Sequence, residues 1–139
     1  MSTSSAPPFT LERIDHVLLL VEGMERALAF YQNVLGCSLE SRLPQFAMAE
    51  LRAGASMLAL VDVAAPEGRW AQPAAHGGRN MDHLCLALGP HRESALRRHL
   101  ERCGVEIVEE GHHGNPGDHS LSLYVRDPSG NLIELKSPP

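Results

Sequence analysis

Hydrophobic and polar residues change their period several times along the chain, and each change marks an expected element. Residues 14–21 form an apolar run of Val, Leu and Ile that is too short for an ordinary helix, so we expect a strand buried on both faces. From Met24 to Leu35 apolar side chains recur with helical spacing, and Gly36 stands where a left-handed helix end is favoured. Three short β-type segments divided by a proline and a glycine follow, at 37–43, 46–52 and 56–62. This stretch predicts the order βαβββ.

The same succession of patterns occurs a second time. Residues 64–80 lose periodicity and collect proline and glycine, which is typical of a connector. After it we expect a strand at 82–88, a helix at 91–103 ended by Gly104, and strands at 105–109, 120–126 and 132–136. The period, from His16 to His83, is too long for a solenoid repeat. The sequence therefore predicts an α+β chain of two tandem βαβββ modules.

Chain length suits one domain made of both modules. With 139 residues the chain lies in the usual size range of a single domain. We expect residues 1–10 to be a flexible tail and residues 11–139 to form one domain, with module one at 13–63, the connector at 64–80 and module two at 81–137.

Composition excludes several classes of partner. The formal charge is −5 and the 12 Lys and Arg residues are scattered, so no basic stripe for nucleic acid is present. No apolar run reaches the length of a membrane span, and the first residues lack the pattern of a signal peptide. The three cysteines form no CxxC and cannot all pair, which favours a reducing compartment and hence the cytoplasm.

An Asp-His pair followed by an apolar run occurs at the start of each module. Either histidine alone would more simply be a structural residue, but His16 and His83 recur at the same phase of the repeat. Glu134 stands in the middle of the apolar closing strand, where a buried carboxylate is costly unless it is paired or bound to a cation. Two histidines and a carboxylate from three strands indicate a divalent metal site with open positions, held by His16, His83 and Glu134.

Four motifs give the chain a specific resemblance. IDHVLLLV, AFYQNVLG, MDHLCLAL and YVRDPSGNLIEL resemble the vicinal oxygen chelate superfamily, which groups glyoxalases, bleomycin-resistance proteins and extradiol dioxygenases. The resemblance implies the fold of that group, in which paired βαβββ modules form a cupped mixed sheet with a divalent metal (Zn, Fe(II), Ni or Mn) on its inner face. It places the ligands at His16, His83 and Glu134.

One position departs from the glyoxalase pattern. Ala59 aligns with Glu134 in the repeat, where glyoxalase I enzymes carry a second metal-binding glutamate. Water or another residue would have to fill that position. Glu50 is the nearest carboxylate, but it lies on the preceding strand and is expected to be an exposed side chain.

Polar side chains near the expected metal are candidates for binding and catalysis. Ser120, Ser122 and Tyr124 share one face of a strand and would orient a polar substrate, unless that face is simply exposed. Cys85 shares the face of His83 and could touch substrate, although a small core thiol is the simpler interpretation. Tyr124 and Glu134 are the candidates for catalysis.

The loop before this strand and the turn after it have separate expected roles. The Gly-rich loop with His112, His113 and His119 could close over the pocket, and Asp127 is expected to cap the turn.

The resemblance leaves the reaction open. A glyoxalase-like lyase or isomerase is the first hypothesis, in which a metal chelates a small oxygenated substrate and a side chain moves a proton next to its carbonyl. A small Fe(II) extradiol-type dioxygenase, a fosfomycin-type thiol transferase and a metal-free drug-binding protein are the alternatives. Relatives of this length usually form homodimers, so we expect a symmetric dimer, in which the modules could pair within or between chains.

Overall fold

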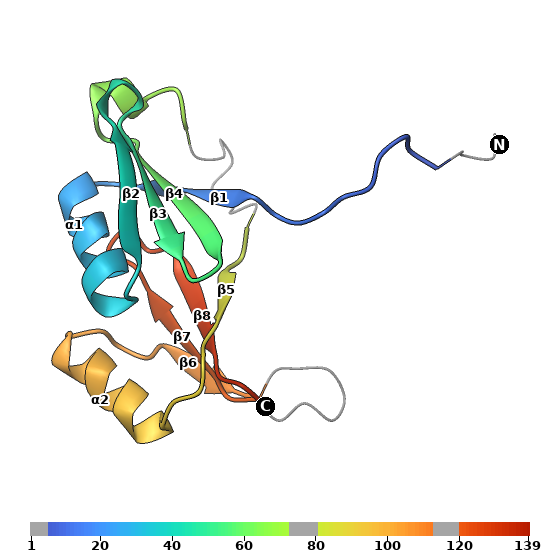
Figure 1. The fold of residues 1–139 in the computed structure, drawn as a ribbon. Helices are drawn as coiled ribbons and strands as arrows, with labels where there is room; N and C mark the ends of the chain where they lie inside the picture. Colours follow the sequence, from blue (N-terminus) through green and yellow to red (C-terminus); the bar gives the residue numbers. More distant parts are fainter. Residues whose placement is uncertain (1–5, 73–80, 113–119) are drawn as a thin grey trace.

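The first module contains four strands and one helical segment (Figure 1). The computed structural model describes residues 6–72, 81–112 and 120–139. Strand β1 (His16–Val21) leads into helix α1 (Met24–Ala29), which continues as the π-helix η1 (Phe30–Val34). Strands β2 (Ser38–Leu43), β3 (Met48–Ala53) and β4 (Ser56–Asp62) follow, with short 3₁₀ turns η2 (Pro44–Phe46) and η3 (Pro66–Gly68).

The second module repeats this order in a shorter form. Strand β5 (Leu84–Ala87) precedes helix α2 (Glu93–Arg102), and β6 (Glu109–Gly111), β7 (Ser122–Arg126) and β8 (Leu132–Lys136) complete it. Each module forms its own four-stranded sheet, with orders β1-β4-β3-β2 and β5-β8-β7-β6. The first strand runs parallel to the last in both sheets, and the other neighbours are antiparallel. The prediction of two tandem βαβββ modules is confirmed.

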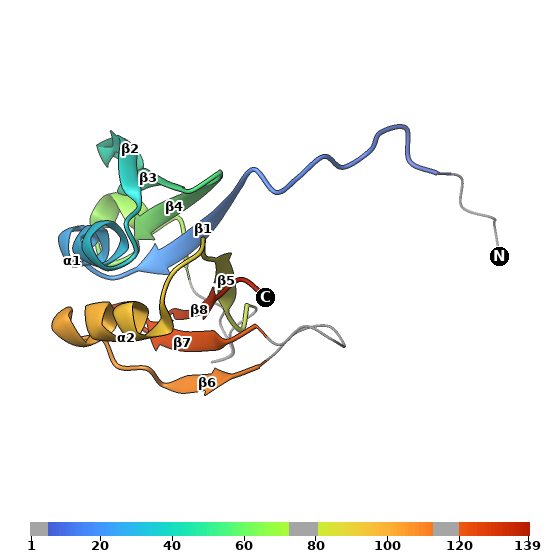
Figure 2. The ribbon, with the colours of Figure 1, turned by 60° about the horizontal axis from the view of Figure 1, so that its bottom comes forward.

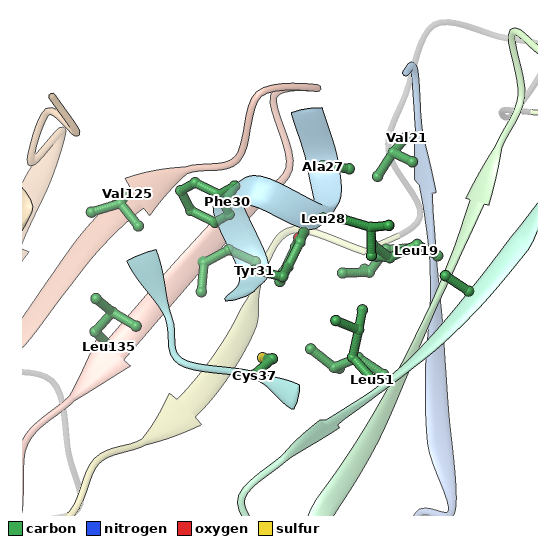
Figure 3. Close-up of a cluster of buried hydrophobic side chains, with 14 of the residues drawn as sticks. Leu19, Val21, Ala27, Leu28, Phe30, Tyr31, Cys37, Leu51, Val125 and Leu135 are labelled. Carbon is green, nitrogen blue, oxygen red and sulfur yellow. The ribbon is translucent and has the colours of Figure 1, made fainter. Parts of the chain in front are cut away.

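The core lies between the two sheets. Figure 2 shows the modules as two layers with both helices at the same end. In Figure 3 the segment carrying Phe30 and Tyr31 lies between the first sheet, with Leu19 and Leu51, and the second sheet, with Val125 and Leu135. One face of each sheet is thus covered by the core. The opposite faces, called the outer faces here, point away from it.

Three polar contacts join the modules at the turn after β7. The Tyr31 hydroxyl donates a 2.7 Å hydrogen bond to Asp127 Oδ2, and both groups are buried. The Asn131 side-chain amide donates to the Leu20 carbonyl at 3.0 Å, and the Glu22 N–H donates to Ser129 Oγ at 2.8 Å. Asp127 also accepts backbone N–H bonds within the turn, which agrees with the expected capping role.

Several details differ from the sequence prediction. The expected strand at 105–109 begins only at Glu109, because Val105 and Ile107 pack against the core without joining the ladder. The strands expected from 82 and 120 begin at Leu84 and Ser122. The expected single helix changes from α to π geometry at Phe30. Strand β1 is not buried on both faces, since Leu19 and Val21 on one face are buried whereas Leu18 and Leu20 on the other are half-buried.

The segment before β1 leaves the body of the molecule without regular structure (Figure 1). Three apolar side chains on it, Phe9, Leu11 and Ile14, are exposed. No helix in the described part of the chain is long and apolar enough to cross a membrane.

Candidate metal centre

Polar side chains cluster on the outer face of the second sheet. Cys85, Glu134 and Tyr124 lie opposite one another on β5, β8 and β7, so their side chains project from the same face. His83, two residues before Cys85, belongs to that face as well. The sequence predicted this grouping of residues, and the strand register explains it.

Glu134 is the centre of the cluster. Its Oε1 lies 2.9 Å from His83 Nε2, and its Oε2 accepts a 2.5 Å hydrogen bond from Ser122 Oγ. Tyr124 also hydrogen-bonds the carboxylate, and its ring meets the His83 imidazole edge-to-face at 5.4 Å between centroids. Glu134 and Ser122 are buried, whereas the His83 side chain is 32 % exposed. Both oxygens of the buried carboxylate therefore have a polar partner, Ser122 on Oε2 and the His83 imidazole on Oε1.

The charges of the cluster stabilise one another. Burial alone would raise the pKa of Glu134, but hydrogen bonds from Ser122 and Tyr124 and the charge of His83 lower it below its usual 4.5. The hydrogen bond to Asp82, together with Glu134, raises the pKa of His83 above 6.5 despite some desolvation. Burial and the neighbouring Glu134 raise the pKa of Tyr124 to about 12 and also raise that of Cys85. At neutral pH Tyr124 is a hydrogen-bond donor and Cys85 a thiol.

Each Asp-His pair fixes the orientation of its imidazole. His83 Nδ1 lies 2.7 Å from Asp82 Oδ2, and His16 Nδ1 lies 2.9 Å from Asp15 Oδ2. A carboxylate on one ring nitrogen is a common companion of metal-binding histidines, because it fixes the tautomer and leaves the other nitrogen as a ligand. In both modules Nε2 is the ring nitrogen that does not contact the aspartate, and in His83 it lies 2.9 Å from Glu134 Oε1.

Only part of the predicted ligand set meets within one chain. His83 and Glu134 are in contact, whereas His16 begins β1 in the other sheet with its side chain 52 % exposed. Among the described residues, no group of three or more His, Cys, Asp or Glu side chains is placed to hold a metal ion. The triad of His16, His83 and Glu134 stays a prediction.

The first sheet carries an equivalent row on its outer face. Ala59 on β4 lies opposite Leu18 on β1 and opposite Glu50 on β3, so Glu50 occupies the place that Tyr124 has in the second module. Glu50 accepts a 2.8 Å hydrogen bond from Ser41 Oγ. The prediction that Glu50 is exposed was wrong: it is half-buried. A cross-strand register places this carboxylate on the face of His16, and the sequence repeat alone does not reveal it.

Other predicted residues lie in varied surroundings. Ser120 is buried two residues before β7 begins. Lys136, which the sequence analysis did not assign to the site, lies opposite Ser122 and Ala87 and so adds a positive charge to the outer face. His112 is exposed, and His113 and His119 lie outside the described residues.

Comparison with known proteins places the chain in a family. Residues 13–135 match the Glyoxalase/Bleomycin resistance protein/Dioxygenase superfamily. The chain belongs to this superfamily. Its members are mostly metal-dependent enzymes acting on small molecules, and divalent metals are common among them.

Individual relatives in the superfamily are distant. The chain is 28 % identical to human mitochondrial methylmalonyl-CoA epimerase over 138 residues, covering 92 % of the chain and 75 % of the relative. It is 31 % identical over 127 residues to virulence protein STM3117 of Salmonella typhimurium, covering 90 % of the chain and 83 % of the relative. The crystal structure of that protein superposes with a TM-score of 0.73 at 26 % identity, covering 94 % and 100 % of the two chains.

A more distant structure contains a metal. A mutant of the fosfomycin resistance protein FosX from Listeria monocytogenes, complexed with Mn(II) and 1S,2S-dihydroxypropylphosphonic acid, superposes with a TM-score of 0.68. It is 16 % identical, covers 91 % of this chain and 90 % of its own, and shares the fold.

Proposed function

We propose that the protein is a metal-dependent lyase or isomerase that moves a proton at the carbon next to a carbonyl group of a small oxygenated substrate. The observation that carries this proposal is the register of β3 and β4, which places the Glu50 carboxylate on the same outer face as His16. A metal ligand and a base on one face are the two components that such a proton transfer needs. The similarity to an epimerase supports the same class of reaction.

The residues of the second sheet fit a divalent metal ion. Glu134 is a buried carboxylate held by Ser122, and His83 is oriented by Asp82 with Nε2 next to Oε1 of Glu134. Nitrogen and oxygen donors of this kind suit Zn, Fe(II), Ni or Mn. A bound ion would attract the substrate oxygen and stabilise the negative charge that develops on it.

The third ligand comes from a second copy of the chain. Strands β1 and β5 are both edge strands, and each begins beside a histidine that follows an exposed apolar residue, Ile14 or Met81. A two-fold dimer that joins these edges would bring His16 of one copy to His83 and Glu134 of the other, and would cover both apolar side chains. Such a dimer has two equivalent sites.

The polar side chains around this site have separate tasks. Glu50 takes the proton from the substrate carbon and returns it, so that the carboxylate is regenerated at the end of each cycle. Tyr124, protonated at neutral pH, donates a hydrogen bond towards Glu134 or the substrate. Ser122 holds Glu134, while Ser120 and Cys85 border the space for substrate.

Metal binding by mixed dimers tests the shared site. The His16→Ala and Glu134→Gln chains are co-expressed with different tags, the mixed dimer is purified, and Mn²⁺ or Zn²⁺ binding is measured by calorimetry. Each parent dimer should bind weakly, because every site lacks one ligand. In the mixed dimer one site carries both mutations and the other carries none, so one ion per dimer should bind with wild-type affinity. Failure of the mixed dimer to recover binding would refute the shared site.

Solvent exchange tests the reaction class. The metal-loaded protein is incubated in D₂O with the hemithioacetal of methylglyoxal and glutathione, or with a methylmalonyl thioester, and deuterium entry at carbon is followed by NMR. Glu50→Gln should lower exchange by about 100-fold or more with metal binding unchanged, the usual scale for loss of a general base. Glu101→Gln, which changes an exposed carboxylate on α2 away from this face, is the matched control. Catechol cleavage or fosfomycin opening without exchange would replace this proposal with another reaction of the superfamily.

A further inference from the structure

A groove of about 570 Å³ lies between the helical ends of the two modules. Side chains of α1 and η1 form one wall, and the other is formed by the residues after α2 and by the turn after β7. His16, Glu50, His83 and Glu134 are not among its lining residues. The groove is therefore separate from the proposed metal site, and its volume is in the usual range for small-molecule sites.

Much of the groove lining is apolar. Phe30 and Val34 of η1 and Val105 and Val108 of the second module belong to it; Phe30 is largely buried, whereas Val108 is 44 % exposed. Figure 3 shows the Phe30 ring directed from the helical segment towards Val125 of the second sheet. The lining segment of the first module is π-helical, a rare geometry that is frequent at functional sites.

Hydrogen bonds hold both walls in place. His99 of α2 lies with its Nε2 2.8 Å from the Val34 carbonyl, which ties α2 to η1. Tyr31, between the lining residues of η1, is tied to Asp127 beside the turn after β7. The two walls are fixed relative to each other, so a ligand would find the groove already formed.

Two arginines, Arg26 and Arg126, line the groove. Arg26 Nε donates to the Glu22 carbonyl at 2.7 Å, and Arg126 donates from Nη1 to the Gly130 carbonyl at 2.9 Å. The segments that anchor these arginines meet, because the Glu22 N–H donates to Ser129 Oγ. Within the described residues neither guanidinium forms an ion pair with a carboxylate. Each charge is thus oriented by the backbone and is not neutralised by a carboxylate of the described chain.

We propose that this groove binds an aliphatic carboxylate, with its head group on Arg26 and Arg126 and its chain over Phe30, Val34 and Val105. Guanidinium groups suit a planar carboxylate, and the apolar walls suit a hydrocarbon chain. The lining contains two arginines and one acidic residue, Glu106. Its net charge is therefore +1, which matches a ligand with a single negative charge.

Octanoate is the probe for this site. It is titrated into the ¹⁵N-labelled full-length protein, and amide shift changes should map to the groove walls, at 26–34 and 103–108. Octanol, which has the chain without the charge, and acetate, which has the charge without the chain, should each bind at least about tenfold more weakly.

Three substitutions and one control decide the outcome. Arg26→Gln and Arg126→Gln should each weaken octanoate binding about tenfold, because each removes a charge-assisted hydrogen bond. Arg98→Gln on α2 removes an exposed arginine outside the groove and should leave the affinity unchanged. Ala29→Trp, an exposed lining position, should block the groove without burying the new side chain in the core. Equal octanoate affinity in all four variants, or shift changes confined to the outer sheet faces, would overturn the proposal.

Discussion

The hydrogen bond from Ser122 to Glu134 provides a direct test of how the candidate site is held. In Ser122→Ala the carboxylate loses its 2.5 Å hydrogen bond from the hydroxyl, while His83 and Tyr124 stay in place. Both partners are buried, so water does not readily replace the lost donor. The substitution removes a single hydroxyl from a fully buried position and changes little else.

The size of the effect follows from burial and charge. A hydrogen bond to a charged group contributes about 1.5–3 kcal/mol, and one pKa unit corresponds to about 1.4 kcal/mol. Ser122→Ala should therefore raise the pKa of Glu134 by about 1–2 units in the metal-free protein. Because a lowered carboxyl pKa stabilises the fold above the unfolded value of 4.5, this stabilisation is lost as the pH falls through the folded pKa. The two proteins should differ most at pH 7 and converge in acid.

Carboxyl NMR and urea unfolding measure these two quantities independently. The Glu134 side-chain carbon is titrated in both proteins, and the free energy of unfolding is determined between pH 3.5 and 7. Ser38→Ala, at an exposed position on β2, is the control and should match the wild type. An unchanged Glu134 pKa together with equal unfolding free energies at pH 7 would refute the assigned hydrogen bond. Metal affinity should also fall about tenfold, as is usual when a group that orients a ligand is removed.

Three further outcomes are expected. Tyr31→Phe removes the hydroxyl that joins η1 to the buried Asp127 carboxylate, and should lower the free energy of unfolding in urea by about 1.5–3 kcal/mol. Gly68→Ala should destabilise by about 1–3 kcal/mol, because its Cβ would overlap the backbone of Asp62, whereas Gly89→Ala has free space and serves as the control in the same thermal assay. The raised pKa of His83 stabilises the metal-free protein below pH 6.5, and this stabilisation should be lost as the pH rises through the folded pKa. In Asp82→Asn the free energy of unfolding, measured from pH 5.5 to 8.5, should therefore fall less steeply with pH than in the wild type.

Local patterns were sufficient to predict most of the elements. The Ser56–Asp62 and Leu132–Lys136 strands have the bounds expected from the sequence, because each is apolar and flanked by residues typical of turns. Gly36 and Gly104 end their helices with positive φ angles of 76° and 70°, as a glycine at that position predicts. These features depend on neighbours along the chain, so periodicity is informative about them.

Features that depend on pairing between strands were harder to predict. Val105 and Ile107 have the composition of a strand, yet they pack on the core and pairing starts at Glu109. The place of Glu50 beside Ala59 depends on the β3–β4 register, which the turn at Gly54 sets and which periodicity does not specify. His16 and His83 lie in different sheets, and their relative position depends on how the two sheets pack. The sequence is compatible with pairing of the modules within one chain or between two chains, so it does not specify that position.

The repeated Asp-His pair acquires two different surroundings from the two sheets. Each aspartate lies against Nδ1 of its histidine, so the two modules share the same local arrangement. Only the second module adds a carboxylate beside the imidazole; the first has the small Ala59 at that place, with Glu50 one strand further along the row. Glu134, in contact with an imidazole, is suited to metal binding. Glu50 lies one strand away from the equivalent position, which would leave room for a substrate whose proton it could take. These two outer faces belong to separate sheets. Our proposal is that two copies of the chain bring them together, and the mixed-dimer experiment tests that pairing directly.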